Sequence, residues 1–399
     1  MKTINTIVIG AGQSGLSVSY FLTKNKVDHL VLERGQLADE IRNRRWDAFH
    51  LITPNHMTRL PGFPYIGKDP NGFDSRDEVV AHLEKYAKSF KAPVAENAEV
   101  LSVTQSKNGF VVKTKDSTYE SRNVVVAIGS FHKPIVPEVA KLIPKGVTQL
   151  HSSQYKNSKK LPTGSVLVVG GGNSGVQIAV DLKRDGREVY LSLGRLRIVP
   201  RNYRGKDFME WAEDMGALDR TTDEATPEIK ATLAPLLYGY GGTVNIRKLA
   251  EDGIRLVGKL KGFENDKFLF DKTLNDAISS GEAALVGFKA AVDKYIADKK
   301  LNAKSEAPEI SKKITYKETS ELNLKESKIK TVIWATGFED DFSFLKVPVF
   351  DKNGEPVHEK GVSTLPGFYF MGLRWLSKYK SFLLVGVAED AEYISGKIK

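Results

Sequence analysis

Two glycine-rich motifs with the same spacing begin at residues 10 and 170 of this chain. The first, Gly-Ala-Gly-Gln-Ser-Gly at 10–15, follows the apolar run Thr-Ile-Val-Ile, and the second, Gly-Gly-Gly-Asn-Ser-Gly at 170–175, follows Val-Leu-Val-Val. In a strand–loop–helix unit, such glycines allow a tight turn, close backbone approach to a pyrophosphate and close helix packing. The pyrophosphate binds where the helix N-terminus presents free N–H groups. The pair of motifs therefore predicts two bound dinucleotides. The residues assigned to them are Gly10, Gly12, Ser14, Gly15, Gly170, Gly172, Asn173, Ser174 and Gly175.

The residue at the end of the next strand distinguishes the two sites. After the first motif this strand ends in Glu33, whose carboxylate suits the ribose hydroxyls of FAD or NAD and repels a 2′-phosphate. After the second motif no acid follows, and Ser192, Arg195 and Arg197 could bind a 2′-phosphate through charge-assisted hydrogen bonds. We therefore predict FAD in the first site, with Arg34 beside it, and NADP(H) in the second. A solvated loop for the arginines and the use of NADH are the alternatives.

The composition excludes several other classes of function. With 41% hydrophobic and 27% charged residues, the chain of 399 residues has the composition of an ordinary soluble globular protein. It contains no cysteine, so it cannot pass electrons through a thiol pair of its own or hold zinc through thiolates. We predict no metal site, because the seven histidines are scattered. The net charge of +10 comes from dispersed lysines, so we expect attraction of anionic dinucleotides and no nucleic-acid binding.

The apolar stretches are far shorter than a bilayer span, and the first strand begins within a few residues of the N-terminus. This leaves no room for a signal peptide. We therefore expect no membrane span and a cytoplasmic location.

The strand and helix patterns predict an α/β fold with two doubly wound, Rossmann-like dinucleotide-binding domains. Residues 98–127 have the alternation of an antiparallel meander, and apolar residues at helical spacing predict a helix at 272–299. A buried strand near 331–337 should return the chain to the first sheet. The predicted domains are a discontinuous FAD-binding domain at 1–145 and 329–399, and an inserted NADP(H)-binding domain at 160–328 with a helical insertion at about 205–320.

With these motifs the chain resembles the flavin-containing monooxygenases, the class B flavoprotein monooxygenases. Besides the two glycine motifs, His-Ser-Ser-Gln-Tyr at 151–155 and Ala-Thr-Gly-Phe at 335–338 match the family. The family's fingerprint FxGxxxHxxx plus an aromatic residue is incomplete here, because its Phe is absent and Gly146 is one residue further from His151. The segment at 45–64 is most similar to the plant YUCCA and bacterial flavoprotein branch.

The resemblance implies that NADPH reduces FAD and that the reduced flavin takes up O2 to form a C4a-peroxyflavin. This species would oxygenate a small organic substrate, which is an amine, a sulfide, a ketone or a 2-oxo acid. The hard chemistry belongs to the cofactor, and the protein must keep water away from it. The expected partners are therefore the substrate and O2. A homodimer is an expectation as well, since dimers are common in that family.

The resemblance also suggests candidate site residues outside the glycine motifs. Trp46 and Asn55 are candidate active-site residues that border the flavin, and packing within the loop is the alternative for both. Thr336 and Gly337 are assigned to the cofactor-binding set, in a close-packed turn between the domains. Two other functions are open: an NAD(P)H oxidase or reductase that passes electrons to a non-thiol acceptor, and a non-enzymatic flavoprotein that senses redox state.

Overall fold

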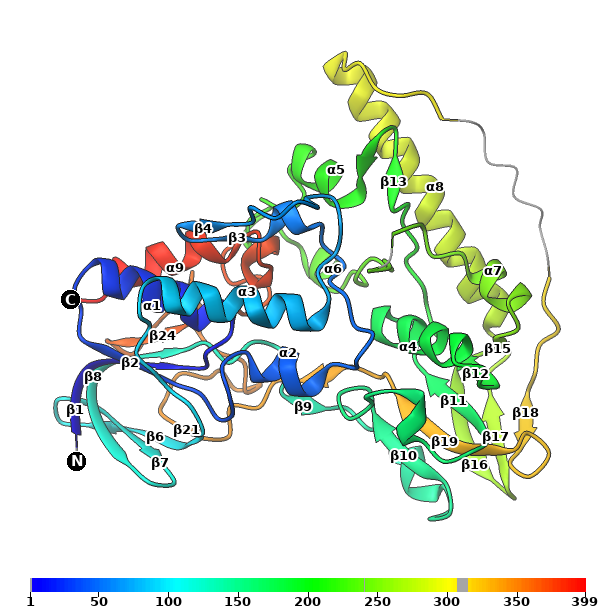
Figure 1. The fold of residues 1–399 in the computed structure, drawn as a ribbon, viewed down its shortest axis with the longest axis horizontal. Coiled ribbons are helices and arrows are strands. Elements are labelled where there is room, and N and C mark those ends of the chain that lie inside the picture. The colour runs from blue at the N-terminus through cyan, green and yellow to red at the C-terminus, as the bar shows by residue number, and fades with distance from the viewer. Residues whose placement is uncertain (1, 240, 307–314) are drawn as a thin grey trace.

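The computed structural model describes residues 2–239, 241–306 and 315–399. Within these ranges the chain forms two large β-sheets, each of which contains the strand that leads into one glycine motif. The first sheet and both termini lie in the left half of Figure 1, and the second sheet lies in the right half. We call these two regions the first part and the second part of the molecule.

The first sheet is a mixed sheet built around the N-terminal strand. Its strands are β1 (Lys2–Ile9), β2 (His29–Leu32), β5 (Val94–Ala95), β6 (Val100–Ser106), β7 (Gly109–Thr114), β8 (Thr118–Val126), β21 (Leu345–Lys346), β22 (His358–Glu359), β23 (Val362–Ser363) and β24 (Phe368–Phe370). β1 pairs in parallel with β2 and with β8. β6, β7 and β8 form the antiparallel meander that the sequence predicts. β24 pairs in parallel with β8, so the C-terminal segment returns to this sheet.

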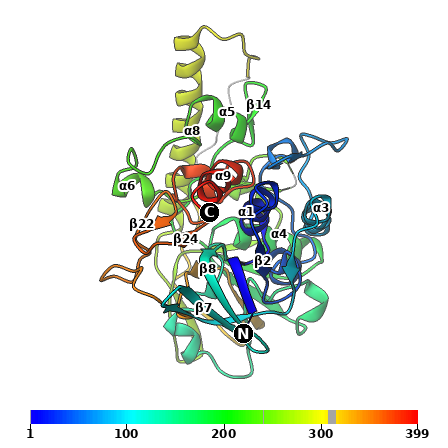
Figure 2. The same cartoon turned by 90° about the vertical axis from the view of Figure 1, so that its left-hand side faces the viewer.

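Helices of the first part cover this sheet. They are α1 (Gln13–Lys24), α2 (Asp39–Arg44), α3 (Arg76–Ser89), α9 (Val387–Ser395) and the 3-10 turns η1 (Asn55–Met57) and η4 (Tyr379–Phe382), with a small hairpin of β3 (Arg59–Leu60) and β4 (Phe63–Pro64). Figure 2 shows α1 between α9 and α3, and α1 contacts both. Fully buried side chains of the strands and helices, such as Ile7, Leu16, Val125 and Ile394, form one apolar core. This core fixes the start of α1 directly behind β1.

The second sheet is entirely parallel. Its strands, in spatial order, are β10 (Thr148–His151), β19 (Ile329–Trp334), β11 (Ser165–Val169), β12 (Val189–Ser192) and β15 (Arg255–Val257). α4 (Asn173–Arg184) follows the second glycine motif and packs on β11 and β12. β11, which leads into the second motif, is the central strand of this sheet, and β1, which leads into the first motif, lies between β8 and β2 inside the first sheet.

The two faces of the second sheet are covered differently. Successive residues of a strand point to opposite faces, and Val166 and Val168 pack with Val176 on the α4 side. Leu167 and Val169 point to the other face, into a cluster with aromatic residues of a small antiparallel sheet. That sheet consists of β16 (Leu260–Glu264), β17 (Lys267–Phe270) and β18 (Glu321–Asn323). The α/β dinucleotide-binding class is confirmed, with strands instead of helices on this face.

Two chain crossings connect the parts, and they run side by side. β9 (Lys133–Pro134) on the way out pairs with β20 (Phe338–Glu339) on the way back. The remaining turns of this region are η2 (Glu138–Leu142) and η3 (Ser158–Lys160). Because both crossings are paired to each other, the parts are joined by a two-stranded ribbon.

The predicted domain boundaries need two corrections. Residues 329–334 were expected in the FAD-binding domain, but they form β19, which pairs with β10 and β11 in the second sheet. A run buried on both faces fits either sheet, so its composition alone could not choose between them. The chain rejoins the first sheet at β21, and β24 pairs with β8 further along.

The helical insertion predicted at about 205–320 is also wrong in part, because it contains β15, β16 and β17. Its other elements are β13 (Asn202–Tyr203), β14 (Lys206–Asp207), α5 (Phe208–Asp214), α6 (Pro227–Lys230), α7 (Ile246–Glu251) and α8 (Leu274–Lys299). The helix expected at 272–299 is confirmed as α8, whose C-terminal end projects from the rest of the molecule in Figures 1 and 2. Residues 240 and 307–314 of the predicted insertion lie outside the described residues.

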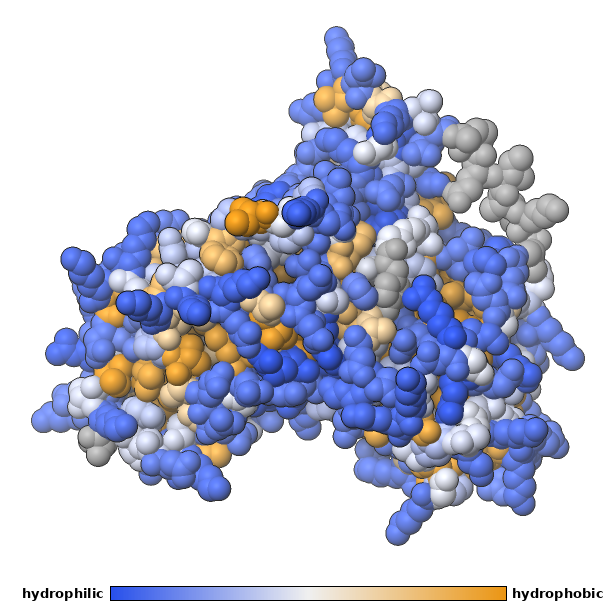
Figure 3. Space-filling model, viewed as in Figure 1, coloured by the Kyte–Doolittle hydropathy of each residue, from blue (hydrophilic) through white to orange (hydrophobic). Residues whose placement is uncertain are grey.

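The surface is mainly hydrophilic on the face seen in Figure 3, where apolar residues form only small patches. Among the described residues, none of the helices has both the length and the apolar character required to cross a lipid bilayer.

Candidate functional site

The first glycine loop has the backbone geometry of a pyrophosphate cradle. Gly10 has φ +106°, and a Cβ there would lie 2.6 Å from the carbonyl oxygen of Ala127. A Cβ at Gly15 would lie 1.9 Å from the carbonyl oxygen of Gly10, so only glycine lets α1 start this close to its strand. A Cβ at Gly12 would meet no atom within 4 Å. Gly12 is the N-cap of α1 and no side chain caps the helix, so the N–H groups of the first turn face open space.

Glu33 stands beside this cradle, where the sequence places it. Its side chain is 7% exposed, and its Oε2 accepts a hydrogen bond of 2.7 Å from the backbone N–H of Ala11. Burial raises the pKa of Glu33, and the N–H groups of Ala11 and Gly35 oppose this effect. Each carboxylate oxygen has two acceptor sites, so acceptor capacity is left for ribose hydroxyls. Arg34 lies 3.7 Å from both Asp39 and Glu40.

The second glycine loop repeats the same geometry. Gly170 has φ +126°, and a Cβ there would lie 2.2 Å from the carbonyl oxygen of Ala335. A Cβ at Gly175 would lie 1.9 Å from the carbonyl oxygen of Gly170, whereas a Cβ at Gly172 would meet nothing within 4 Å. Gly172 is likewise an N-cap without a capping side chain. Both cradles therefore fit a dinucleotide pyrophosphate.

Asn173 of the second motif is held by the protein itself. Its Nδ2 donates to the carbonyl oxygen of Pro235 at 3.1 Å, and its Oδ1 accepts from the N–H of Leu237 at 2.8 Å. The side chain therefore anchors the segment 235–237 beside the cradle. Ser14 of the first motif is 5% exposed and packs against Gly372, while Ser174 is half-buried.

The residues predicted for the 2′-phosphate differ in their availability. The hydroxyl of Ser192 donates to the carbonyl oxygen of Gly258 at 2.9 Å and accepts from the N–H of Leu260 at 3.0 Å. Its single O–H donor is thus used, and a direct phosphate contact from Ser192 is not supported. Arg195 is exposed and has no hydrogen-bond or ion-pair partner in the part of the chain that the structure describes. Arg197 donates to the carbonyl oxygen of Leu233 at 3.2 Å. Arg197 thus keeps most of its N–H donors, and none of the donors of Arg195 has a partner among the described residues.

Trp46 lies in the core of the second part although it precedes the crossing. It is 1% exposed, belongs to the apolar cluster of Tyr155 and Val176, and makes an edge contact with Phe49 at 5.3 Å. Its indole Nε1 is buried without a hydrogen-bond partner among the described residues. Trp46 therefore anchors the first part to the second, and its burial in an apolar cluster favours the packing alternative over contact with the flavin.

Asn55 organises a loop, and every polar atom of its side chain has a partner. Oδ1 accepts from the N–H of Asp74 at 2.7 Å, and Nδ2 donates to the carbonyl oxygen of Asp69 at 3.0 Å and lies 3.4 Å from the hydroxyl of Tyr65. The side chain is 3% exposed. The loop-packing alternative describes Asn55, and the structure does not support contact with a substrate.

Thr336 and Gly337 belong to the crossing between the parts. The Thr336 hydroxyl donates to the carbonyl oxygen of Ile135 in the other crossing. His151 Nδ1 accepts from the N–H of Ser153, so its Nε2 carries the proton and donates to the carbonyl oxygen of Gly337 at 3.0 Å. Burial lowers the pKa of His151, which keeps the ring neutral. These contacts support an interdomain turn more directly than a cofactor contact.

Two functional positions escape sequence reasoning. The side chain of Gln13, at a variable position of the first motif, donates to the carbonyl oxygen of Phe382 at 2.7 Å and ties the C-terminal segment to the first glycine loop. Arg201 is almost completely buried and bridges the two parts. Neither residue stands in a motif that assigns a partner, so no signal in one sequence could identify them.

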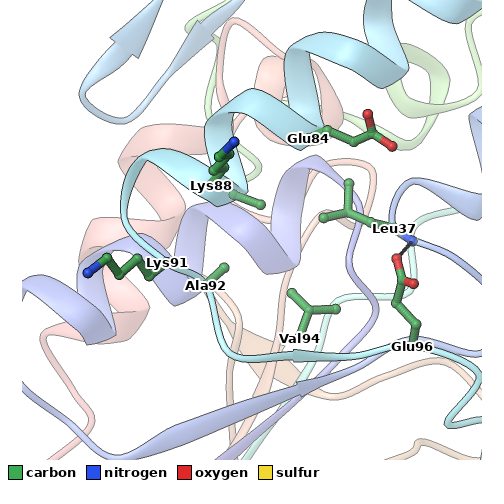
Figure 4. A pocket seen from close by; sticks show the side chains of 8 residues that line it. Leu37, Glu84, Lys88, Lys91, Ala92, Val94 and Glu96 are labelled. Atoms are coloured by element: carbon green, nitrogen blue, oxygen red, sulfur yellow. Dashed lines mark hydrogen bonds between the residues drawn. The ribbon is translucent and has the colours of Figure 1, made fainter.

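A shallow depression that is lined by no residue of either glycine motif lies against the C-terminal end of α3 (Figure 4). It is formed by residues of α3, the following loop and β5, and the side chains of two lysines stand at its edge. Glu96 there accepts from the N–H of Leu37 at 2.8 Å. The residues that line it are Leu37, Glu84, Ala87, Lys88, Lys91, Ala92, Val94 and Glu96.

Two cradles on two sheets, together with the absence of cysteine, define a two-dinucleotide flavoprotein oxidoreductase without a thiol centre. A model of the family "Pyridine nucleotide-disulphide oxidoreductase" matches residues 7–208. A CzcO-like oxidoreductase of Geobacillus kaustophilus is 33% identical over 99% of this chain and 98% of its own length. The chain belongs to the pyridine nucleotide-disulphide oxidoreductase family, and its cofactors are FAD and NAD(P)H.

The resemblance to flavin-containing monooxygenases is confirmed by two further matches. The probable indole-3-pyruvate monooxygenase YUCCA1 of Arabidopsis thaliana is 28% identical over 98% of this chain and 89% of its own length. The structure of a flavin-containing monooxygenase from Stenotrophomonas maltophilia has a TM-score of 0.68 at 20% identity and covers 100% of this chain and 98% of its own. The chain is thus a flavin-dependent oxidoreductase with monooxygenases among its relatives.

The open cradles predict separable effects of glycine substitutions. Gly12→Ala and Gly172→Ala should fold normally, since both positions have negative φ and free space. We expect each added methyl group to take up space needed by a bound pyrophosphate, so Gly12→Ala should be purified without yellow colour and Gly172→Ala should keep FAD but lose NADPH binding. Flavin absorbance and NADPH titration measure both. Gly175→Ala is the comparison variant for a crowded position of the same loop, and it is expected to unfold because its Cβ would lie 1.9 Å from the carbonyl oxygen of Gly170. Equal loss of FAD in Gly12→Ala and Gly172→Ala would contradict separate sites.

Arg195 should discriminate between the two pyridine nucleotides. Arg195→Ala should raise the KM for NADPH about 10- to 150-fold, as expected for the loss of one charge-assisted hydrogen bond, and leave that for NADH nearly unchanged. Ser192→Ala is the control, since its hydroxyl has other partners and should not change the NADPH to NADH ratio. Steady-state rates of NADPH and NADH oxidation by each variant give the KM values. Equal changes for the two nucleotides in Arg195→Ala would refute the assignment.

Trp46 should matter more for stability than for chemistry. Trp46→Ala should lower the free energy of unfolding by about 3–5 kcal/mol, because it leaves a large cavity in a buried cluster. Trp46→Phe should cost much less, since most of the packing is kept. Urea denaturation of the FAD-bound protein measures both, with Leu101→Ala, 53% exposed, as control. A loss below about 1 kcal/mol in Trp46→Ala would be incompatible with an anchoring role.

Proposed function

We propose that this chain is an FAD-dependent, NADPH-using monooxygenase that transfers one oxygen atom of O2 to a small organic substrate. The observation that carries the proposal is the pair of complete, separate pyrophosphate cradles in a chain without cysteine. Electrons from NADPH would then pass to the flavin, and the chain has no cysteine thiol to accept them from the flavin. The substrate classes proposed are amines, sulfides, ketones and 2-oxo acids.

The overall reaction balances without a further reductant. NADPH and a proton supply two electrons and two hydrogens; one oxygen atom of O2 enters the substrate and the other leaves as water. When bound, FAD supplies hydride acceptance and oxygen activation. We assign FAD to the first cradle with Glu33 and NADP(H) to the second with Arg195.

The residues of this chain bind, orient and exclude water. The open first turns of α1 and α4 hold the two pyrophosphates, and Glu33 receives a ribose. An apolar cluster containing Met57, Phe208 and Val385 joins segments of both parts and keeps water out of the space between them. Water exclusion protects the oxygenating species from decay to hydrogen peroxide.

A second candidate is an NAD(P)H oxidase or reductase with a non-thiol acceptor. The family description names electron transfer with a pyridine nucleotide and no insertion of oxygen, which is the observation in its favour. It needs the same two cradles and the same cofactors. The two candidates differ only in the fate of the electrons once the flavin is reduced, so kinetics with O2 distinguish them.

The deciding experiment is stopped-flow absorbance of the NADPH-reduced protein mixed with oxygenated buffer. We expect a species spectrally distinct from oxidised and reduced flavin that persists for seconds before oxidised flavin returns. Addition of a true substrate should shorten its lifetime and give oxygenated product. Direct return of oxidised flavin with one peroxide per NADPH would reject the monooxygenase and favour the second candidate.

A further inference from the structure

Arg201 is a completely enclosed cation with partners in three segments of the chain. Its side chain is 1% exposed. Nε donates to Asp207 Oδ2 at 2.6 Å, and Nη2 donates to the other oxygen of the same carboxylate. Nη1 donates to the carbonyl oxygen of Ile52 at 2.8 Å and lies 3.5 Å from that of Tyr238. The guanidinium also lies over the ring of Phe73 at 4.8 Å.

These partners belong to both parts of the molecule. Ile52 and Phe73 are in the long loop of the first part, which contains η1. Asp207 is the N-cap of α5 in the insertion and accepts from the N–H of Met209. One side chain therefore connects the first part to the insertion. Only a bidentate group with a third free donor can make this set of contacts, and guanidinium is that group.

The insertion is fixed to the second part through α8. The rings of Phe208 and Phe288 are 4.7 Å apart, and those of Trp211 and Tyr295 are 6.4 Å apart, which attaches α5 to the second half of α8. The first half of α8, from Leu274, packs into the core of the second part. Figure 1 shows α5 between α8 and the β3–β4 hairpin. Arg201 thus completes a continuous connection from the second part to the first.

The same region adjoins both cradles. Tyr238 follows the segment that Asn173 of the second motif holds. On the other side, Gln13 of the first motif holds the carbonyl oxygen of Phe382, three residues before Val385. Val385 and Leu237 meet in one buried cluster with Met57 and Phe208. Hydride transfer requires the reactive ends of two dinucleotides anchored on different parts to come into contact, so these ends must meet between the parts.

We propose that Arg201 is a positioning residue that clamps the insertion onto the loop at 52–57 and so closes the protein over the reacting end of the flavin against water and small solutes. This inference rests on the proposed function for its purpose. The connection that Arg201 makes between the insertion and the loop can be tested without any oxygenation reaction. It needs only the FAD-bound protein.

The test uses Arg201→Lys, which keeps a cation beside Asp207 but cannot also reach the carbonyl oxygen of Ile52. We expect amide hydrogen exchange in 52–58 and 208–214 to become at least about tenfold faster, because a charge-assisted hydrogen bond is lost. Iodide should quench the fluorescence of bound FAD with a severalfold larger Stern–Volmer constant. FAD content and exchange in β1 and β11 should not change.

The matched control is Arg59→Gln. Arg59 makes a bidentate pair with Glu213 that links the same loop to α5, but both side chains are partly exposed. Such pairs contribute little, so both readouts should stay at their wild-type values. If Arg201→Lys does not fold, the double variant Arg201→Gln/Asp207→Asn removes both buried charges together and is expected to give the same changes.

Unchanged amide hydrogen exchange in residues 52–58 and 208–214 of Arg201→Lys would overturn the clamp. Faster exchange with unchanged iodide quenching would overturn the closure over the flavin. Neither readout depends on oxygen transfer. Direct return of oxidised flavin in the stopped-flow experiment on the wild-type protein would therefore reject the monooxygenase function and leave the clamp unaffected. Conversely, the wild-type protein can form an oxygenating species while Arg201→Lys changes neither amide hydrogen exchange nor iodide quenching. That result would reject the clamp and leave the proposed function standing.

Discussion

The close approach of a helix to the loop in front of it is the constraint on which the rest of this structure depends. At Gly15 and Gly175 a Cβ would lie 1.9 Å from the carbonyl oxygen of the first glycine of the motif. Without that side chain, α1 and α4 begin directly behind their strands, and the uncapped N–H groups of their first turns face open space. The two sheets and their buried cores hold the N-terminal ends of α1 and α4 in place.

Because the cradles are on separate sheets, the chain must also control how the two parts meet. It does so with several contacts of different kinds. Trp46 from the first part is buried in the second, His151 of the second part donates to Gly337 in the crossing, and Arg201 joins the insertion to the loop of the first part. Buried contacts of this kind are costly to break, whereas the exposed ion pairs between the same segments contribute little. The interface between the parts is therefore defined by a few enclosed groups.

The sequence was informative where local geometry determines the structure and uninformative where distant segments meet. Both cradles, Glu33 and α8 follow from spacing within one segment, and all are where the sequence predicts them. The sequence predicts the strand 329–334 in the first sheet, but it pairs in the second, since a strand buried on both faces carries no information about its neighbours. The partners of Arg201 are 6 to 149 residues away in the chain, and no periodicity encodes such contacts.

Three residues predicted to contact a substrate or cofactor indicate how this protein would support its chemistry. Asn55, Asn173 and Ser192 each occupy positions that suggested contact with a substrate or cofactor, yet their side chains hold loops in place. A protein that carried out acid–base or nucleophilic chemistry itself would need such groups free and within reach of the substrate. When two cofactors supply the reactive atoms, the protein instead needs fixed loops, a dry space between its parts and a cationic contact for selectivity. Among the described residues Arg195 has no hydrogen-bond or ion-pair partner, whereas the hydroxyl of Ser192 is engaged. We expect this distribution of polar groups in a protein that binds its cofactors and leaves the reaction to them.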